Sequence, residues 1–540
     1  MEQPSARASR QTDNSLPERT DVLVIGAGPA GSSAAAWAAR DGHDVLLVDA
    51  ATFPRDKTCG DGLTPRAVAE LDRLGLGDWL RTHTVNRGLR LEGFGQRLEL
   101  PWPDGSFPTQ GSAVPRTELD DRIRRTAVEA GAHMVDGTKA VSVDRDGDRI
   151  TAVTMRTSSG LRTVACRRLV VADGVRSPLG KILGRTWHRD TAYGVAARAY
   201  ASSPRSDDPW ITSHLELRDP AGTLQPGYGW VFPLGSGEVN IGVGTLATSA
   251  RPASGSLRPL IDLYAAQRRP EWGLGEVTRV ASALLPMGGA VSGIAGRNWA
   301  LIGDAAACVN PLNGEGIDYG LEGGRLAARV LDSDDLTHLW PTLLRERYGR
   351  AFSAARRLAG LLTIPQFLPA TGPIAMRSRA LMTVAVRVMG NLVTDADADL
   401  VARAWRTGGA RLDALGPTSP VRLRHRAAVQ RSTEPRCAAL YRTALCSALP
   451  NRAVQRHDPP GEVAPPHRLP PRSLDPQRQF LLIRPGPNRL RQIDIRVGVA
   501  AHRAGHARQR PHEVLHVDRA QRLPDRSREL THHKPSPPAW

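Results

Sequence analysis

The 540-residue sequence lacks the features that would assign a membrane span, an export signal or a metal site. It has no run of about 18 uncharged apolar residues, so we predict no transmembrane helix. Residues 1–20 contain no apolar segment and therefore do not form a secretory signal. The cysteines are too scattered for a disulfide framework or a C-x-x-C metal site; they are Cys59, Cys166, Cys308, Cys437 and Cys446. These absences favour the cytoplasmic side of the membrane, and we expect no metal.

Positive charge is concentrated near the end of the chain, although the total of +18 is high. Residues 421–540 hold 23 Lys and Arg against 9 Asp and Glu, which leaves 49 of the 72 bases and 45 of the 54 acids in the first 420 residues. The same 120 residues hold 16 Pro, 9 of the 15 His and 22 Arg but only 4 Gly, without a sustained period of 2 or 3.6. We therefore predict that residues 416–540 form a disordered Arg/Pro/His-rich tail.

Two interpretations of this tail stay open. One is a basic arm that binds nucleic acid or membrane. The tail has just one lysine, Lys534, and few aromatic residues to stack on bases. The other interpretation is unselected sequence, of the composition that a shifted reading frame in GC-rich DNA would encode. We favour the second, and we expect no nucleic-acid partner.

What the sequence does contain begins with an apolar, β-branched run at residues 22–25, which predicts a buried strand. Gly26, Gly28 and Gly31 follow at G-x-G-x-x-G spacing, an alanine-rich segment predicts a helix, and a second apolar run ends in Asp49. Such glycines permit a tight turn and close approach of a pyrophosphate to a helix N-terminus, while the acid holds ribose hydroxyls. We therefore predict a dinucleotide site rather than a plain turn. This stretch alone does not distinguish NAD from FAD.

The remaining pattern divides the chain into an α/β domain, an antiparallel sheet and a helical end. Helices are predicted at 65–82, 116–130, 256–267, 318–332, 336–362 and 374–392. The predicted parts are a disordered leader at 1–20, a discontinuous Rossmann-like dinucleotide-binding domain at 21–187 and 286–335, an antiparallel β domain for substrate at 188–285, a C-terminal helical region at 336–415 and the tail at 416–540.

Three distant stretches share one form, in which a buried strand ends in glycine or aspartate. They are residues 26–31, Asp173-Gly174 and Gly303-Asp304. The loop after Asp304 reaches Gly314 and Gly316, whose backbone N–H groups suit an anion or an electron-rich ring edge. A single Asp-Gly pair is usually a turn, but three such strand ends in this order indicate one composite site.

These motifs resemble those of FAD-dependent proteins with the p-hydroxybenzoate hydroxylase-type fold. The resemblance rests on G-A-G-P-A-G at 26–31, A-D-G at 172–174, and G-D at 303–304 with P-L-N-G-E-G at 311–316. It implies FAD, with Asp49 on the adenosine ribose and Asp304 on the ribityl chain. The implied cofactor-binding residues are Gly26, Gly28, Pro29, Ala30, Gly31, Asp49, Cys59, Gly60, Asp61, Gly62, Arg116, Asp173, Asp304, Gly314, Glu315, Gly316 and Ile317.

Two further segments narrow the resemblance to the geranylgeranyl reductase family. P-R-D-K-T-C-G-D-G at 54–62 is similar to the family's P-R-x-K-x-C-G segment, and Y-G-W-V-F-P at 228–233 is similar to its Y-x-W-x-F-P pocket motif. The resemblance spans about residues 20–412 and implies an oxidoreductase that saturates an isoprene double bond in the tail of menaquinone or a related geranylgeranyl lipid. It implies Tyr228, Trp230 and Phe232 as substrate-binding residues. Cys59, Tyr228 and Trp230 are the catalytic candidates.

Alternatives remain for the activity and for single residues. An aromatic row on a strand is often only core, and Cys59 could relay a proton or simply pack beside the flavin. A monooxygenase or halogenase of the same fold is the rival activity. A halogenase is expected to show W-x-W-x-I-P and a catalytic lysine, whereas this chain has Tyr228 and Phe232. The electron donor, NAD(P)H or a redox protein, is open because only one complete dinucleotide fingerprint is present.

A lipid substrate requires contact with a bilayer surface. Residues 360–393 are apolar and carry only basic charges, at Arg377, Arg379 and Arg387. This composition is typical of an interfacial helix near anionic lipid, and core packing explains it equally well. We expect a peripheral protein on the cytoplasmic side of the plasma membrane.

Overall fold

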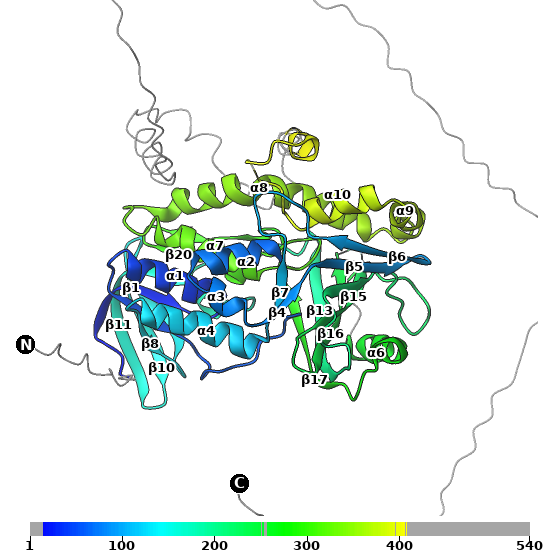
Figure 1. Ribbon diagram of the computed structural model, residues 1–540. Helices are drawn as coiled ribbons and strands as arrows, with labels where there is room; N and C mark the ends of the chain where they lie inside the picture. The colour runs from blue at the N-terminus through cyan, green and yellow to red at the C-terminus, as the bar shows by residue number, and fades with distance from the viewer. Residues whose placement is uncertain (1–14, 250, 253–255, 395, 406, 408–540) are drawn as a thin grey trace, which may run out of the picture. The chain divides into compact units, whose positions relative to one another are not determined.

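The computed structural model describes residues 15–249, 251–252, 256–394, 396–405 and 407 (Figure 1). The predicted tail at 416–540 lies outside these residues, as does most of the predicted leader. The disordered leader predicted at 1–20 is wrong at its last two residues, because strand β1 (Arg19–Ile25) already begins there. The strand extends this far because Arg19 pairs with Ala165 of β11 (Gly160–Val171), a long-range partner that the polar sequence of the leader does not reveal.

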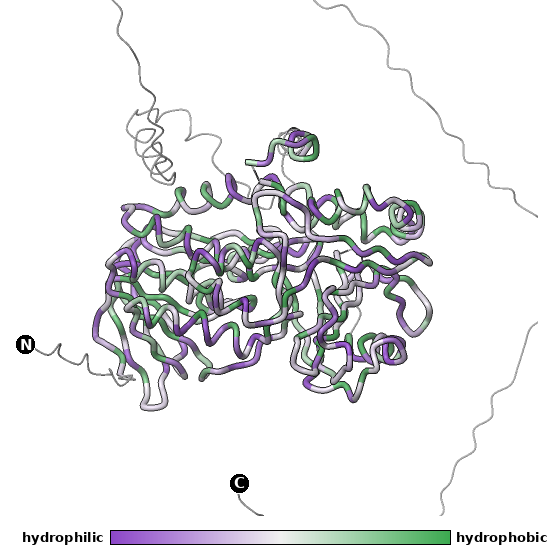
Figure 2. The backbone as a smooth tube through the Cα atoms, in the orientation of Figure 1, coloured by the Kyte–Doolittle hydropathy of each residue, from purple (hydrophilic) through white to green (hydrophobic). Residues whose placement is uncertain are grey.

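An eight-stranded sheet carries the glycine motif. Its path runs β19-β20-β11-β1-β2-β8, with β10 and β9 continuing from β11. Strand β1 pairs in parallel with β11 and with β2 (Val45–Val48), and residues 22–25 are all buried because both faces of the sheet are covered. Figure 2 shows hydrophobic, green segments running through the interior of this part of the molecule, with purple segments along its outline. The other strands are β8 (His133–Val135), β9 (Lys139–Asp146), β10 (Arg149–Thr157), β19 (Ala295–Gly296) and β20 (Trp299–Leu301).

Small residues let two helices pack closely beside this sheet. Helix α1 (Pro29–Arg40) begins directly after the glycine turn and lies beside α7 (Ile317–Ala328) (Figure 1). A Cβ atom on Gly324 of α7 would lie 2.5 Å from the carbonyl oxygen of Ala30, so only glycine permits this approach. Helix α4 (Arg116–Glu129) packs on the other side of α1 and matches the helix predicted at 116–130.

The second sheet has seven strands in the order β17-β13-β16-β15-β14-β5-β6, and β14 and β5 are its one parallel pair. Helix α6 (Arg258–Trp272) covers one face, where Ile261 and Tyr264 pack against Val231 and Ile241. The strands are β5 (Gly88–Gly93), β6 (Gln96–Pro101), β13 (Tyr193–Ser202), β14 (Trp210–His214), β15 (Gly227–Pro233), β16 (Glu238–Ala247) and β17 (Thr278–Leu285).

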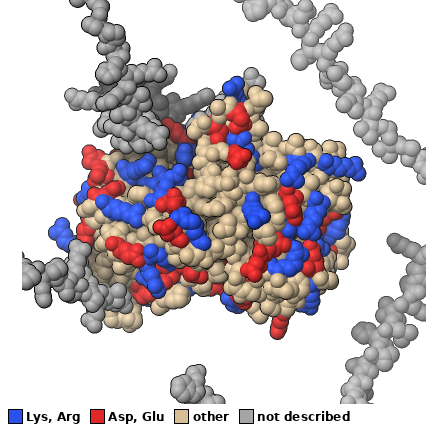
Figure 3. All heavy atoms as spheres, viewed as in Figure 1, with Lys and Arg blue, Asp and Glu red and all other residues tan. Residues whose placement is uncertain are grey.

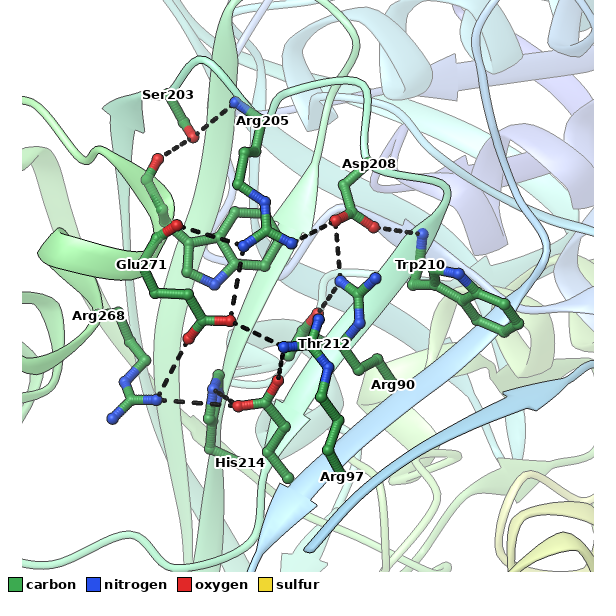
Figure 4. A network of polar contacts seen from close by, with 12 residues as sticks. Arg90, Arg97, Ser203, Arg205, Asp208, Trp210, Thr212, His214, Arg268 and Glu271 are labelled. Carbon is green, nitrogen blue, oxygen red and sulfur yellow. Dashed lines mark hydrogen bonds and ion pairs between the residues drawn. The ribbon is translucent and has the colours of Figure 1, made fainter.

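The predicted domain boundaries placed β5 and β6 with the dinucleotide-binding part at 21–187. The structure corrects this, because both strands belong to the second sheet. An alternating strand pattern does not say which sheet the strand joins. The choice is made by long-range contacts: β5 pairs with β14, Glu92 of β5 lies 3.1 Å from His214 of β14, and Arg90 of β5 pairs with Asp208 at 2.9 Å (Figure 4).

Glu92, His214 and Glu271 place three potential metal ligands within 4.8 Å of one another. Arginines already occupy this cluster (Figure 4). Arg97 lies 3.4 Å from both carboxylates, and Arg268 lies 3.9 and 3.6 Å from them. We interpret the group as an ion-pair network that joins β5 to β14 and α6.

Three helices follow the sheets, α8 (Leu336–Leu362), α9 (Phe367–Met376) and α10 (Arg379–Met389). The helix predicted at 374–392 is confirmed as α10, but its bounds are wrong, because residues 374–376 belong to the separate helix α9. The Ser378 hydroxyl caps α10 by accepting from the Leu381 N–H group at 3.2 Å, which starts a new helix where the pattern alone continues. Within the described residues no single helix is long and apolar enough to cross a membrane, although α8 and α9, bent by 111°, pass by length and composition as a pair.

Short elements complete the described chain. The helix predicted at 65–82 is interrupted at Gly75, whose φ of +89° ends α2. On the face shown in Figure 3, acidic and basic side chains are interspersed, as the near-balanced charge of the first 420 residues predicts. The short elements are β3 (Gly62–Leu63), α2 (Pro65–Arg73), α3 (Gly77–Leu80), β4 (Thr84–Asn86), β7 (Gly111–Ala113), α5 (Pro178–Ile182), β12 (Thr186–Trp187), β18 (Val291–Ser292) and the 3₁₀ turn η1 (Gly303–Ala306).

Candidate active site

One cavity of about 750 Å³ connects the glycine turn after β1 with the helices α8 to α10. This is a size typical of cofactor and ligand sites, which span roughly 300–1,000 Å³. All but one of the residues predicted for the site line it; they are Gly26, Gly28, Pro29, Ala30, Asp49, Cys59, Gly60, Asp61, Gly62, Arg116, Asp173, Tyr228, Trp230, Phe232, Asp304, Gly314, Glu315, Gly316 and Ile317. Gly31 is the exception and lies behind the wall.

The glycines of the first turn have separate structural tasks. Gly26 has φ +103°, and a Cβ there would lie 2.3 Å from the Ala172 carbonyl oxygen. A Cβ on Gly31 would lie 1.7 Å from the Gly26 carbonyl oxygen, so Gly31 is required for packing within the loop. Gly28 faces open space apart from the Arg55 guanidinium, 3.3 Å from its notional Cβ. A diphosphate can therefore approach the N-terminus of α1 at Gly28.

Asp49 closes this turn from the end of β2. Its Oδ2 accepts from the Ala27 N–H group at 2.7 Å and its Oδ1 from the Ala51 N–H group at 2.8 Å. The carboxylate thus holds the glycine loop, and each oxygen keeps a lone pair for another donor. Contact with the ribose stays a prediction.

Arg55 is a site residue that the sequence interpretation missed. It lies beside Gly28 and pairs with Asp120 at 2.9 Å, and Arg116 binds the same carboxylate at 2.7 Å. Two guanidinium groups share one carboxylate, which leaves net positive charge beside the glycine turn. The signal was present in the P-R-D-K run at 54–57, where we used the segment only for its resemblance.

Aspartates 173 and 304 line the middle of the cavity. Asp173 accepts from the Ser177 hydroxyl at 2.6 Å and the Leu179 N–H group at 2.8 Å, and so caps α5. Asp304 lies in η1, with Lys57 Nζ 3.7 Å from its Oδ2. Both aspartates line the same cavity as Gly314 and Gly316. Their predicted contacts with the cofactor remain predictions.

These features fit FAD. Of the three glycines in the turn, Gly28 is the one that leaves room for a ligand, and cationic groups lie beside it. The wall of the same cavity also includes Asp49, Asp173 and Asp304. Glycines 60 and 62 extend that wall, since a Cβ on either would come within 3.2 Å of the Phe232 ring.

The aromatic row of β15 forms the other end of the site. Alternation places Tyr228, Trp230 and Phe232 on the cavity face, while Val231 packs towards α6. Neighbouring ring centroids are 5.9 and 6.1 Å apart. Gly242, opposite Trp230 on β16, leaves room for the indole, because its Cβ would lie 2.1 Å from that ring.

Hydrogen bonds hold these aromatics in place. Trp230 Nε1 donates to Asn240 Oδ1 at 2.9 Å, and the Tyr228 hydroxyl donates to the Asn313 carbonyl oxygen at 2.5 Å. Asn240 was missed by the sequence interpretation. Its signal was a polar residue inside the apolar strand pattern EVNIGVG.

Cys59 lies between the two ends. Its Sγ accepts from the Asp61 N–H group at 3.4 Å, and its carbonyl oxygen accepts from Asn240 Nδ2 at 2.9 Å. Burial raises the pKa of the Cys59 thiol, although nearby Arg116 opposes the shift. The side chain is therefore a neutral thiol, which suits packing or weak proton donation and does not suit a nucleophilic role.

Comparison with known proteins agrees with this geometry. The FAD binding domain family matches residues 19–331. Menaquinone reductase of Mycobacterium tuberculosis is 67% identical over 396 residues, which cover 73% of this chain and 97% of the relative. The chain belongs to the menaquinone reductase family. FAD is its cofactor, and the predicted resemblance to geranylgeranyl reductases is confirmed.

More distant proteins extend the menaquinone reductase family to a wider group. A digeranylgeranylglycerophospholipid reductase of Methanopyrus kandleri is 30% identical over 352 residues, covering 63% of this chain and 90% of the relative. A geranylgeranyl bacteriochlorophyll reductase-like structure from Thermoplasma acidophilum has a TM-score of 0.60 at 22% identity, covering 72% of this chain and 98% of its own. A flavin-dependent brominase structure has a TM-score of 0.58 at 19% identity, covering 74% and 100%. The last two show the fold alone, which is the predicted p-hydroxybenzoate hydroxylase-type α/β fold.

Proposed function

We propose that this enzyme uses FAD to saturate one isoprene double bond in the prenyl tail of menaquinone. The observation that supports this most directly is the single cavity, in which the FAD-binding loops meet an aromatic row and then an apolar passage. Its apolar part suits a hydrocarbon tail; the lining residues there include Leu89, Leu91, Ile211, Leu358, Leu362, Met376, Met382, Val386 and Met389.

The chemistry explains why aromatic side chains stand beside the cofactor. An isolated trisubstituted alkene is not polarised, so its reduction develops positive charge on the tertiary carbon. Bound reduced FAD supplies the hydride. Trp230 and its neighbours Tyr228 and Phe232 present ring faces that stabilise such a charge by cation–π attraction. Asn240 keeps the indole of Trp230 oriented for this role.

Exclusion of water is the second task of the site. The passage between β5, β14 and the helices α9 and α10 is lined by Leu91, Trp102, Met376 and Met382, which are buried and apolar. A developing cation in this passage meets few water molecules that could capture it. We propose that Cys59, as a neutral thiol, helps to position the double bond beside the cofactor.

We propose further that helices α9 and α10 contact the cytoplasmic surface of the plasma membrane. Their inner faces line the cavity, while Ile374 is 68% exposed and Leu381 is 50% exposed. Leu361 and Ile364, at and just after the end of α8, are 44% and 46% exposed. Exposed apolar side chains beside basic residues favour an anionic bilayer surface. A lipid tail could then enter the passage directly from the membrane.

The enzyme also needs an electron donor that reduces its FAD. Because the sequence holds one complete dinucleotide fingerprint, we propose that NAD(P)H or a redox protein reduces the FAD during a transient encounter.

Lipid mass spectrometry of a menaquinone-producing cell, with and without this protein, tests the proposed reaction. We expect the menaquinone mass to rise by two hydrogen atoms when the protein is present, and the purified FAD-loaded enzyme to produce the same shift with a chemical reductant. A mass shift only in glycerolipid or chlorophyll chains would assign another prenyl substrate. Oxygen-dependent hydroxylation or halogenation by the purified enzyme would contradict a reductase role.

A further inference from the structure

Asp61 is a buried acid in the wall of the cavity, between Gly60 and Gly62, whose notional Cβ atoms lie 3.2 and 3.0 Å from the Phe232 ring. Its side chain is fully buried, and its backbone has φ +62°, the left-handed region that few residues other than glycine adopt. A strained residue at this point of a cavity is a candidate for function.

The two oxygens of the Asp61 carboxyl group differ in their partners. Oδ2 accepts from the Tyr200 hydroxyl at 2.7 Å and from Asn240 Nδ2 at 2.9 Å. Among the described residues Oδ1 has no hydrogen-bond partner, although it is buried. Since Oδ2 already receives two donors, the proton of the neutral acid is carried by Oδ1.

We propose that Asp61 is the catalytic acid that delivers the proton in alkene saturation, an inference that rests on the proposed function. The same Asn240 that binds Asp61 Oδ2 through its Nδ2 binds Trp230 through its Oδ1. One amide therefore ties the acid to the aromatic ring that faces the developing charge. A buried acid without a partner for its own proton has the free donor that this reaction needs.

The step balances with the proposed reductant. The π-electron pair of the alkene forms a C–H bond with the Oδ1 proton at the less substituted carbon, and the O–H bond breaks. The tertiary carbon receives the hydride supplied by bound reduced FAD, which is oxidised. The Asp61 carboxylate then regains a proton from solvent.

The surroundings of Asp61 let it keep its proton to a higher pH than an ordinary aspartate does. Burial raises its pKa to about 6, although Tyr200, Asn240, Arg116 and Arg198 all favour the charged form. Cys59, in the same loop, is a neutral thiol at this pH, so it adds no charge beside Asp61. A bound hydrocarbon tail removes more solvent and raises the pKa of Asp61 further.

Asp61→Asn tests the proposal in the FAD-loaded full chain. Asparagine tolerates the left-handed backbone and can still accept from Tyr200 and Asn240. We expect FAD content and the Kd for the prenyl lipid to be unchanged, while turnover falls by about 100-fold or more. Asp318→Asn is the matched control, since Asp318 is also buried with a raised pKa, of about 7, but does not line the cavity; its turnover should remain near wild type.

The variant Tyr200→Phe distinguishes a catalytic role of Asp61 from a structural one. Removing this hydroxyl removes a hydrogen bond to the charged form, which raises the pKa of Asp61. Because the acid works only when protonated, the high-pH decline of kcat should move to higher pH, with no such move in Asp318→Asn. Infrared difference spectra of wild type minus Asp61→Asn should show the C=O band of one neutral carboxylic acid that disappears as pH rises.

The outcomes distinguish this proposal from the proposed function. If Asp61→Asn keeps turnover close to wild type, or loses FAD instead of turnover, Asp61 is not the proton donor. An unmoved pH profile in Tyr200→Phe would also overturn it. Failure of the wild-type enzyme to saturate the prenyl lipid would refute the proposed function itself.

Discussion

Trp230 lines the cavity between Tyr228 and Phe232 on strand β15. The residue is 6% exposed, lies opposite Gly242 and is anchored by Asn240, so its position is determined by packing on one side and by one hydrogen bond on the other. A side chain held in this way presents a fixed ring face and does not have to be ordered during the reaction.

Trp230→Ala should lower kcat for menaquinone reduction by about 30-fold, because a desolvated cation–π contact contributes about 2 kcal/mol. Trp230→Phe should recover part of the loss, since a ring face remains. Trp187→Ala is the control, because Trp187 lies on β12 outside the cavity. Equal turnover in Trp230→Ala and wild type, measured by liquid chromatography of the reduced lipid, would remove Trp230 from the mechanism.

At the scale of elements, helix α2 illustrates how buried charge organises the body. Arg66 of α2 pairs with Glu322 of α7, lies 3.2 Å from Asp318, and stacks on the ring of Tyr319 at 4.7 Å. Burial raises the pKa of Glu322, but Arg66, Arg347 and Arg325 outweigh it and hold the pKa at about 2. This stabilisation is present above the usual carboxyl range and is lost as pH falls towards 2.

Arg66→Met should destabilise the protein by about 3–5 kcal/mol, because it leaves buried carboxylates without one partner. Arg73→Met, on the same helix, removes a half-exposed ion pair with Glu70 and should change stability by less than about 1 kcal/mol. Denaturant unfolding of the FAD-loaded variants measures both values. Equal stability of the two variants would show that the Arg66 network is not important for folding.

In the proposed function, the inner faces of helices α9 and α10 line the cavity and their exposed side chains contact the membrane. Replacing Ile374 and Leu381 together by Asp should weaken binding to anionic lipid vesicles by about 10-fold or more, since burial of one such side chain contributes about 1.5–3 kcal/mol. Leu161→Asp is the control, because Leu161 is 58% exposed on β11 and belongs to neither helix. Vesicle co-sedimentation gives the affinities. Identical binding of the two variants would exclude these helices as the contact surface.

At the scale of the whole molecule, the cavity-lining residues found in the described part of the chain lie between Ile25 and Gly390. Deletion of residues 421–540 should therefore preserve FAD content and turnover, while it lowers the net charge from +18 to +4. Deletion of residues 378–540 is the counterpart and should abolish turnover, because it removes α10 from the cavity wall. Absorbance of bound flavin and lipid turnover measure the two effects. Loss of flavin from the shorter deletion would show that the tail belongs to the fold.

Much of the cavity lining of the candidate site could be predicted from local signals. Gly26 is required by its own φ of +103°, and Gly31 by its approach to the Gly26 carbonyl oxygen, so their spacing carries the information. Arg55 was missed because its role depends on Gly28, which lies 27 positions earlier in the chain. Asn240 and Tyr200 were missed for the same reason, as both donate hydrogen bonds to Asp61 from distant strands.

The sequence by itself determined that this chain has a glycine turn for a dinucleotide, aspartates at strand ends and an aromatic strand, because these depend on short-range backbone geometry and on alternation along one strand. Only the tertiary structure decided that β5 and β6 join the second sheet and that α9 and α10 are separate helices. It also decided that Asn240 and Tyr200 donate hydrogen bonds to Asp61. Those outcomes depend on contacts between residues far apart in the chain, which no local pattern records.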